Sequence, residues 1–169
     1  MMKAIGALTL STPSDRELKM EREFDAPRRL VYEAFTKPEL VRRWLSGLPG
    51  WTMPVCEIDL RVGGSYRYVW RKGDVEMGMG GVYREIVAPE KIVATEKFDE
   101  AWYPGEAVST FVFTEKAGKT MFSQTVLYDS KEALEAVLKS PAEEGVAMSY
   151  DRLADVLSSL KTSGKPAGA

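Results

Sequence analysis

The sequence contains no histidine among its 169 residues. Histidine is the commonest general base and the commonest neutral metal ligand in proteins. Its absence excludes a Ser-His-Asp triad, a Cys-His dyad and a histidine-based zinc site. Any catalysis would have to use carboxylates, Tyr, Lys or Arg.

Cysteine is almost absent as well, because Cys56 is the single example. One cysteine cannot form an intrachain disulfide, and this count suits a reducing compartment, so we expect a cytoplasmic protein. Cys56 is expected to be a small buried hydrophobe in a strand, with a reactive thiol as the alternative. No apolar run approaches the roughly 20 residues that a membrane-spanning helix needs.

Neither sign of charge dominates, since 23 Lys and Arg stand against 25 Asp and Glu, a net charge of −2. The basic residues are interleaved with acidic ones along the chain. A nucleic acid or an anionic membrane as partner requires clustered Lys and Arg. We therefore expect no nucleic-acid partner and no membrane span.

The length suits one domain that buries roughly 70% of its extended-chain surface on folding. We place this domain at residues 16–161 and expect residues 1–15 and 162–169 to be flexible tails. An added edge strand is the alternative for the first ten residues. The chain shows no repeat and no linker that would divide it.

Residues 16–24 alternate between apolar and charged side chains, which predicts a half-buried strand. A helical stretch opens at Pro27. The spacing of Thr36 and Glu39 is that of a capping box, so a second short helix is expected over residues 37–45.

A long β region follows, with expected strands at residues 57–62, 65–71, 75–87, 91–98, 108–115 and 120–128. The connections between them are short, which favours an antiparallel sheet. Gly78, Gly80 and Gly81 fall inside one of these strands. They match no nucleotide-binding loop and indicate curvature instead.

The last part of the chain is predicted to be helical. A short helix is expected at residues 131–139, and Ser140, Pro141 and Glu143 give the start signals of a longer one. Its apolar positions form one stripe, namely Val146, Tyr150, Leu153, Leu157 and Leu160. A curved sheet with one apolar face needs a cover, and this helix is long enough to provide it. The predicted class is therefore α+β.

Several segments resemble the activator of heat-shock-protein-90 ATPase homologue family, which belongs to the START-like, or SRPBCC, superfamily. The first is EFDAPRRLVYEAFT at residues 23–36. The others are KPEL at 37–40 with Trp44, GGSYRY at 63–68, GVYREIVAPEKIV at 81–93 and SYDRL at 149–153. Many relatives carry Trp where this chain has Val146, a difference that bears on cavity size.

The resemblance implies a helix-grip fold, in which a curved antiparallel sheet of about six or seven strands wraps around a long C-terminal helix. Two short helices should follow the first strand. An apolar cavity should lie between sheet and helix. The residues expected to line it are Tyr66, Tyr68, Trp70, Tyr83, Glu85, Phe111, Phe113, Val146, Tyr150 and Leu153. Those expected at its mouth are Trp44, Trp51 and Trp102. The alternative for both sets is ordinary filled core.

Alternation along the strand places Glu85 on the same face as Tyr83, so Glu85 is the carboxylate expected inside the cavity. The leading hypothesis is that the protein binds a small hydrophobic or aromatic molecule there. The family name suggests a second, a regulator that stimulates a chaperone ATPase. A third is a cyclase- or hydrolase-like enzyme acting through Glu85 and Tyr83. We assign no catalytic residue, no metal site and no cofactor, and the oligomeric state stays open.

Overall fold

The computed structural model describes residues 2–163, and these form an α+β fold with one antiparallel sheet. The sheet has nine strands in the order β1-β2-β3-β9-β8-β7-β6-β5-β4. In chain order the strands are β1 (Met2–Ile5), β2 (Leu8–Ser14), β3 (Glu17–Phe24), β4 (Thr52–Ile58), β5 (Ser65–Lys72), β6 (Val75–Val87), β7 (Lys91–Phe98), β8 (Ala107–Lys116) and β9 (Lys119–Leu127).

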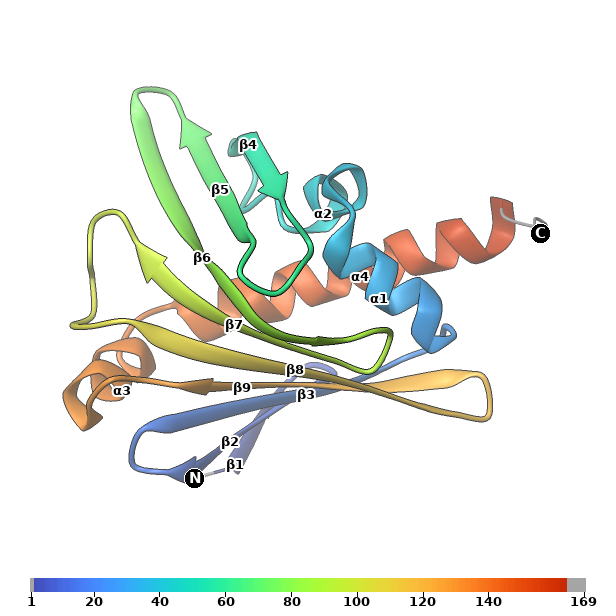
Figure 1. Cartoon of the computed structure of the whole chain (residues 1–169), viewed down its shortest axis with the longest axis horizontal. Coiled ribbons are helices and arrows are strands. Elements are labelled where there is room, and N and C mark those ends of the chain that lie inside the picture. The colour runs from blue at the N-terminus through green and yellow to red at the C-terminus, as the bar shows by residue number, and fades with distance from the viewer. Residues whose placement is uncertain (1, 164–169) are drawn as a thin grey trace.

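The described chain has four helices, two between β3 and β4 and two after β9. They are α1 (Arg28–Thr36), α2 (Pro38–Trp44), α3 (Lys131–Leu138) and α4 (Ala142–Ser163). Figure 1 shows the sheet curving so that β4–β6 rise away from β1–β3, with α4 running behind the strands. Both α1 and α2 contact α4. The long C-terminal helix and the curved sheet that the sequence predicts are confirmed.

The sheet is larger than predicted, with nine strands in place of about six or seven. Both additional strands come from residues expected to be a tail. Leu8 and Leu10 of β2 are fully buried, and Leu10 pairs with Met20 of β3. The two short helices consequently follow the third strand of the chain. At the other end Thr162 still belongs to α4, while residues 164–169 of the expected second tail lie outside the described residues.

Two helix starts show how local hydrogen bonds decide element boundaries. Thr36 does not cap α2, because its hydroxyl donates to the carbonyl oxygen of Tyr32 at 2.9 Å, inside α1. The expected capping box is therefore wrong. Ser140 does cap the last helix, and its Oγ accepts from the Ala142 amide at 3.2 Å. The side chain of Glu143 does not complete a box there, since it pairs with Lys3.

Strand β6 contains a register shift that changes which side chains face inward. Tyr83 pairs with Ala94 of β7, but the next pair along is Glu85 with Val93. Strand β6 therefore has one extra residue, Arg84, between these two pairs, whereas the two partners on β7 are adjacent in sequence. Such a bulge reverses the alternation of the side chains that follow it.

The main core lies between α1, α4 and the middle of the sheet. Its centre is an aromatic cluster in which Phe35 stacks on Phe122 with centroids 4.7 Å apart. Leu153 and Leu157, in the second half of α4, are almost completely buried. The second half of α4 thus packs into this core, whereas the first half lies outside it. No helix of the described residues is long and apolar enough to cross a membrane.

Candidate functional site

A cavity of about 480 Å³ lies between the sheet and the first half of α4. Its walls are mostly aromatic and aliphatic, and they come from both halves of the sheet as well as from α2 and α4. All four tryptophans of the chain border it. Of the residues expected to line it, the following do so: Tyr66, Tyr68, Trp70, Tyr83, Phe111, Val146 and Tyr150.

The aromatic wall is built by one strand whose alternate residues share a face. Tyr66, Tyr68 and Trp70 of β5 follow one another at centroid distances of 5.1 and 5.9 Å. Tyr83 of β6 lies 5.6 Å from Tyr66. The hydroxyl of Tyr66 donates to the carbonyl oxygen of Thr95 at 2.7 Å. Burial raises the pKa of Tyr66 and of Tyr83, so these phenols stay neutral hydrogen-bonding groups.

The opposite wall is the first half of α4. Val146 is half-buried there, and Tyr150 is buried. The Tyr150 hydroxyl donates to Oε1 of Gln124 at 2.8 Å, and Gln124 in turn donates to Ser109 at 3.2 Å. This chain of hydrogen bonds fixes Tyr150, a residue of the cavity wall, against β9.

The loop between α2 and β4 forms one rim of the cavity, and Arg152 of α4 holds it. The Arg152 guanidinium donates to the carbonyl oxygens of Trp44, at 3.2 Å, and Gly47, and to the Ser46 hydroxyl at 3.4 Å. Trp70 adds a bond from its Nε1 to the carbonyl oxygen of Leu45 at 2.6 Å.

The three tryptophans expected at the mouth differ in exposure. Trp102 is 39% exposed and Trp51 is half-buried, so both suit a rim position. Trp44 is only 3% exposed. Its ring packs on Phe35 at 4.8 Å and its Nε1 donates to the carbonyl oxygen of Ala34 at 2.9 Å. Trp44 therefore borders the cavity from inside the core and does not lie at an open mouth.

One end of the cavity is acidic, which the sequence did not predict. Glu96 of β7 lies on the cavity wall in register with Ala94 and Phe98. Its Oε2 accepts a hydrogen bond from the Tyr103 hydroxyl at 2.9 Å. Burial raises the pKa of Glu96, and the bond from Tyr103 partly offsets this rise. Alternation of side chains, the rule that was applied to Tyr83 and Glu85, would have placed Glu96 on the inward face of its strand.

Glu143 of α4 is the second carboxylate on the cavity wall and is 6% exposed. Its Oε1 lies 2.7 Å from the Lys3 ammonium of β1. Its Oε2 is buried and has no hydrogen-bond partner in the part of the chain that the structure describes. The N-terminal strand therefore neutralises this carboxylate from outside the cavity.

Glu85, the carboxylate expected inside, lies on the outer face of the sheet. Its side chain is 48% exposed and its Oε2 is 3.4 Å from the Lys91 ammonium. The bulge at Arg84 is the reason, because it turns Glu85 away from the face that holds Tyr83. Glu85 and Tyr83 do not meet in the cavity, which removes the basis for an enzyme built on that pair.

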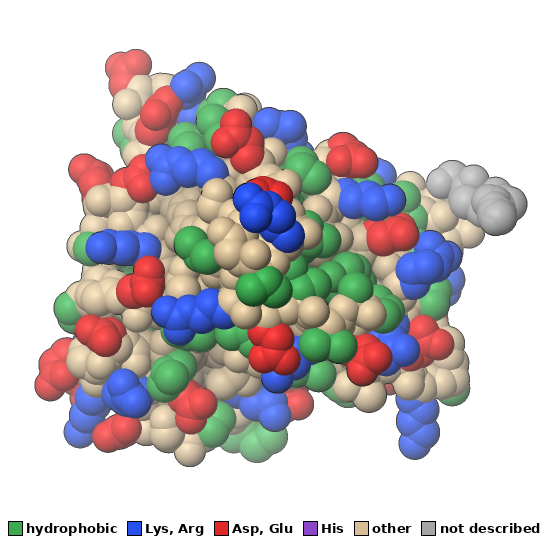
Figure 2. All heavy atoms as spheres, in the orientation of Figure 1, with side chains coloured by type: hydrophobic (Ala, Val, Ile, Leu, Met, Phe, Trp, Pro, Cys, Tyr) green, Lys and Arg blue, Asp and Glu red, His purple; other side chains and the backbone are tan. Residues whose placement is uncertain are grey.

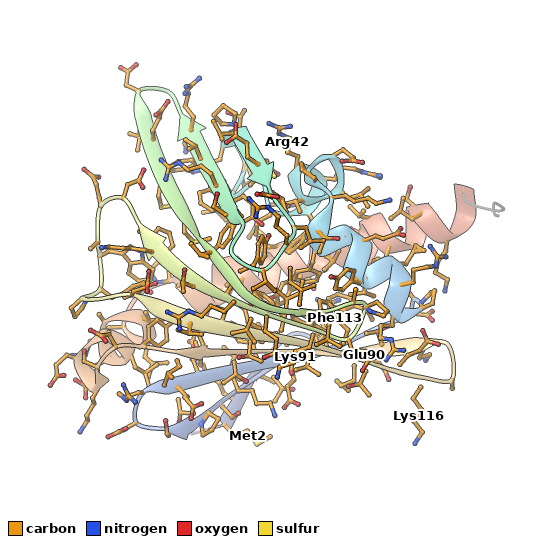
Figure 3. The ribbon with its side chains drawn as sticks, viewed as in Figure 1. Met2, Arg42, Glu90, Lys91, Phe113 and Lys116 are labelled. Atoms are coloured by element: carbon orange, nitrogen blue, oxygen red, sulfur yellow. The ribbon has the colours of Figure 1, made fainter. Side chains whose placement is uncertain are left out.

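Phe113 and Leu153 are also misplaced by the sequence argument, since neither borders the cavity. Phe113, labelled in Figure 3, lies beside α1, where its ring is 5.5 Å from Tyr32 and 5.5 Å from Phe35. Leu153 is fully buried in the core. Alternation along a strand or helix identifies the inward face, but it does not separate filled core from cavity wall.

Groups that could support other chemistry are sparse. Among residues 2–163, no group of three or more Cys, Asp or Glu residues is arranged to hold a metal ion. Cys56 is buried, as expected, and burial raises the pKa of its thiol to about 11. Figure 2 shows one face of the molecule, on which acidic and basic side chains are interspersed without a broad area of one sign.

Comparison with known proteins agrees with this architecture. A Rhodobacter sphaeroides protein of known structure superposes with a TM-score of 0.86 at 27% identity, covering 91% of this chain and 99% of that chain. For a Chromobacterium violaceum protein the TM-score is 0.70 at 27% identity, covering 85% and 98%. For a Mycobacterium smegmatis protein it is 0.76 at 22% identity, covering 93% and 97%. A comparison with curated proteins found no match.

The sequence pattern of one family matches residues 25–158, which run from just before α1 into α4. That family is described as Activator of Hsp90 ATPase homolog 1-like protein. The match covers every element that lines the cavity except β3, which supplies Leu18 and Met20 and ends at Phe24. With its helix-grip fold, this chain belongs to the family of activator of Hsp90 ATPase homologue 1-like proteins.

Proposed function

We propose that this protein binds one small, mainly apolar molecule in the cavity beneath α4. The observation that carries the proposal is the cavity itself, about 480 Å³ of space whose walls are mainly aromatic and aliphatic side chains. Ligand cavities typically measure about 300–1,000 Å³ and combine apolar walls with a few polar groups. The walls, the size and the few polar groups all support this assignment.

The driving force for binding is the removal of apolar surface from water, at about 25 cal/mol per Å². Aromatic walls suit a flat or ring-containing molecule, because offset and edge-to-face contacts add about 0.5–1.5 kcal/mol per ring pair. The rim residues Trp51 and Trp102 extend this surface outward.

Native mass spectrometry of freshly purified protein is the first test, since a tightly bound molecule would add its mass to the chain. A thermal-shift screen with apolar compounds is the second. A compound present at about 100 times its Kd stabilises the folded state by about 2.7 kcal/mol.

Cavity-filling variants connect any such signal to this site. Val146→Trp places a large ring in the cavity and is expected to weaken binding at least about tenfold, or about 1.4 kcal/mol. Met148→Trp is the matched control, because Met148 is on the same helix and 42% exposed. Equal binding by both variants would place the ligand elsewhere.

Stimulation of a chaperone ATPase is a second candidate, which the family description supports. Addition of saturating protein to Hsp90 should then raise its ATP turnover. Unchanged turnover would remove this candidate, and the cavity proposal does not depend on the outcome.

A further inference from the structure

The ionisable groups on the cavity wall are unevenly distributed. Glu96 and Glu143 are acidic, and Arg152 is the one basic residue among the described residues that line the cavity. The Arg152 guanidinium already donates to three acceptors of the rim loop, so it is committed to the protein. The cavity therefore offers carboxylate oxygens to an occupant and no free cation.

Glu96 is the less compensated of the two carboxylates. Within residues 2–163, no Lys or Arg forms an ion pair with it, and its one hydrogen bond comes from the neutral Tyr103 hydroxyl. A buried carboxylate costs free energy unless a donor or a cation offsets the loss of water. An occupant that brings such a group would supply what the protein leaves out.

Glu143 is the second carboxylate of the cavity wall. Lys3 pairs with its Oε1 from outside, and among residues 2–163 its buried Oε2 has no hydrogen-bond partner. Glu143 therefore adds negative charge beside the cavity, while Glu96 is the carboxylate that an occupant can meet. Both Glu96 and Glu143 act on Tyr128, whose pKa is raised first by burial and then by these two charges. Strand register also brings Glu96 close to Tyr128, because Glu96 pairs with Ala107 of β8 and the neighbouring Val108 pairs with Leu127 of β9.

The aromatic rings at this end favour a cation as well. Phe98 contacts Trp102 at 5.6 Å and Tyr103 at 6.0 Å, both edge-to-face. Tyr103 contacts Tyr128 at 5.2 Å. The faces of such rings attract ammonium groups through their quadrupole. A carboxylate on the ligand would instead face Glu96 and be repelled.

We propose, building on the proposed function, that the molecule bound in this cavity is an apolar amine whose ammonium group lies at the Glu96 end. The hydrocarbon part occupies the aromatic region formed by β5 and α4. The ammonium donates to the carboxylate of Glu96.

Three probes that share one ring system and differ in a single substituent test the proposal. Naphthylmethylamine carries an ammonium group at neutral pH, naphthylmethanol is neutral, and naphthoic acid is an anion. Isothermal titration calorimetry at neutral pH should give the amine about a tenfold lower Kd than the alcohol, since a hydrogen bond between charged groups is stronger than one that a neutral hydroxyl makes. The acid should bind most weakly.

Glu96→Gln should abolish the preference for the amine and leave the alcohol's Kd within about twofold, because Gln keeps the shape and loses the charge. Glu85→Gln is the matched control, a carboxylate on the outer face of the same sheet, and should bind all three probes like the unaltered chain.

Equal binding of the three probes would overturn the ammonium assignment and leave the proposed function standing. The tightest binding by the acid, or an undiminished amine preference in Glu96→Gln, would overturn it too. Binding of none of them would remove both proposals. The selectivity of the unaltered protein decides the matter even if a variant fails to fold.

Discussion

A half-buried carboxylate without a cation among residues 2–163 is the group that most sets this molecule apart from a simple apolar container. Glu96 costs stability in its charged form, and the chain retains it on a cavity wall. Perturbed ionisable groups in cavities are common at functional sites. The charge of Glu96 also raises the pKa values of four tyrosines that come from different parts of the fold, Tyr66, Tyr103, Tyr128 and Tyr150.

Glu96→Gln is expected to raise the melting temperature at neutral pH. In the unfolded chain the carboxyl titrates near its ordinary pKa of 4.5, and burial raises this pKa in the folded state. Between the two values the folded state binds more protons, so the stability of the unaltered protein falls as pH rises through that window. Gln keeps the acceptor for Tyr103 and carries no charge.

The difference between variant and unaltered protein should therefore be largest above the folded pKa and should vanish below pH 4.5. Thermal unfolding followed across this pH range measures it. A variant less stable than the parent at neutral pH would contradict the expected sign.

Glu85 and Glu96 show what sequence reasoning can and cannot do for a single residue. Alternation places Glu96 on the inward face correctly, because β7 pairs regularly around it with β8. The same rule fails at Glu85 because the bulge at Arg84 comes directly before it on the same strand. A bulge depends on how two strands pair, and one strand's own sequence does not contain that information.

At the scale of elements, the pairing of β6 with β7 depends on the small size of Gly81. A Cβ at this position would lie 1.9 Å from the carbonyl oxygen of Thr95, which is main chain and cannot move aside easily. Gly145 in α4 is the opposite case, because a Cβ there meets no heavy atom within 4 Å.

Gly81→Ala should therefore destabilise the fold by about 1–3 kcal/mol or more through overpacking. Gly145→Ala should stabilise it by about 1 kcal/mol, since Ala is the better helix former. Urea unfolding of both variants checks the pair. A neutral result for Gly81→Ala would show that β6 and β7 can separate locally without cost.

The rim loop depends on one side chain of another element. Arg152→Met should lose about 1–3 kcal/mol because the partly buried carbonyl oxygens of Trp44 and Gly47 would lose their donor. Hydrogen exchange at residues 45–51 should accelerate, as measured by mass spectrometry. Arg43→Met, an exposed residue of α2, is the control. Equal exchange in the two variants would mean that Trp70 alone holds the loop.

At the scale of the whole molecule, six of the seven central and C-terminal strands, the helix pair and α4 were predictable from periodicity and turn residues. The strand expected at residues 57–62 was wrong, because β4 is Thr52–Ile58 and the chain turns after it, with the Gly64 amide donating to the carbonyl oxygen of Arg61 at 2.8 Å. The N-terminal hairpin was not predictable. Leu8 and Leu10 do alternate with Thr9 and Ser11, but so short a pattern becomes a strand only when β3 offers an unpaired edge. Pairing with β3, which is distant from the first residues in sequence, decided whether residues 8–14 form a strand. In the same way, packing between elements decided which inward-facing residues border the cavity and which fill the core.

The hairpin is an integral part of the domain, so Leu10→Ala should cost about 2–5 kcal/mol, as expected for a fully buried leucine. Leu60→Ala is the control, since Leu60 is 39% exposed, and should change the free energy of unfolding by less than about 1 kcal/mol. Chemical denaturation of both proteins measures the difference. A small effect at Leu10 would return residues 2–14 to the status of a tail.

The position of all four tryptophans around one cavity has an optical consequence. Nearly all of the intrinsic ultraviolet emission of this protein originates within the walls and rim of that single space. An occupant that absorbs at the emission wavelength would quench every fluorophore at once, and a change of polarity there would shift the whole spectrum. The unlabelled chain is thus its own reporter of cavity occupancy.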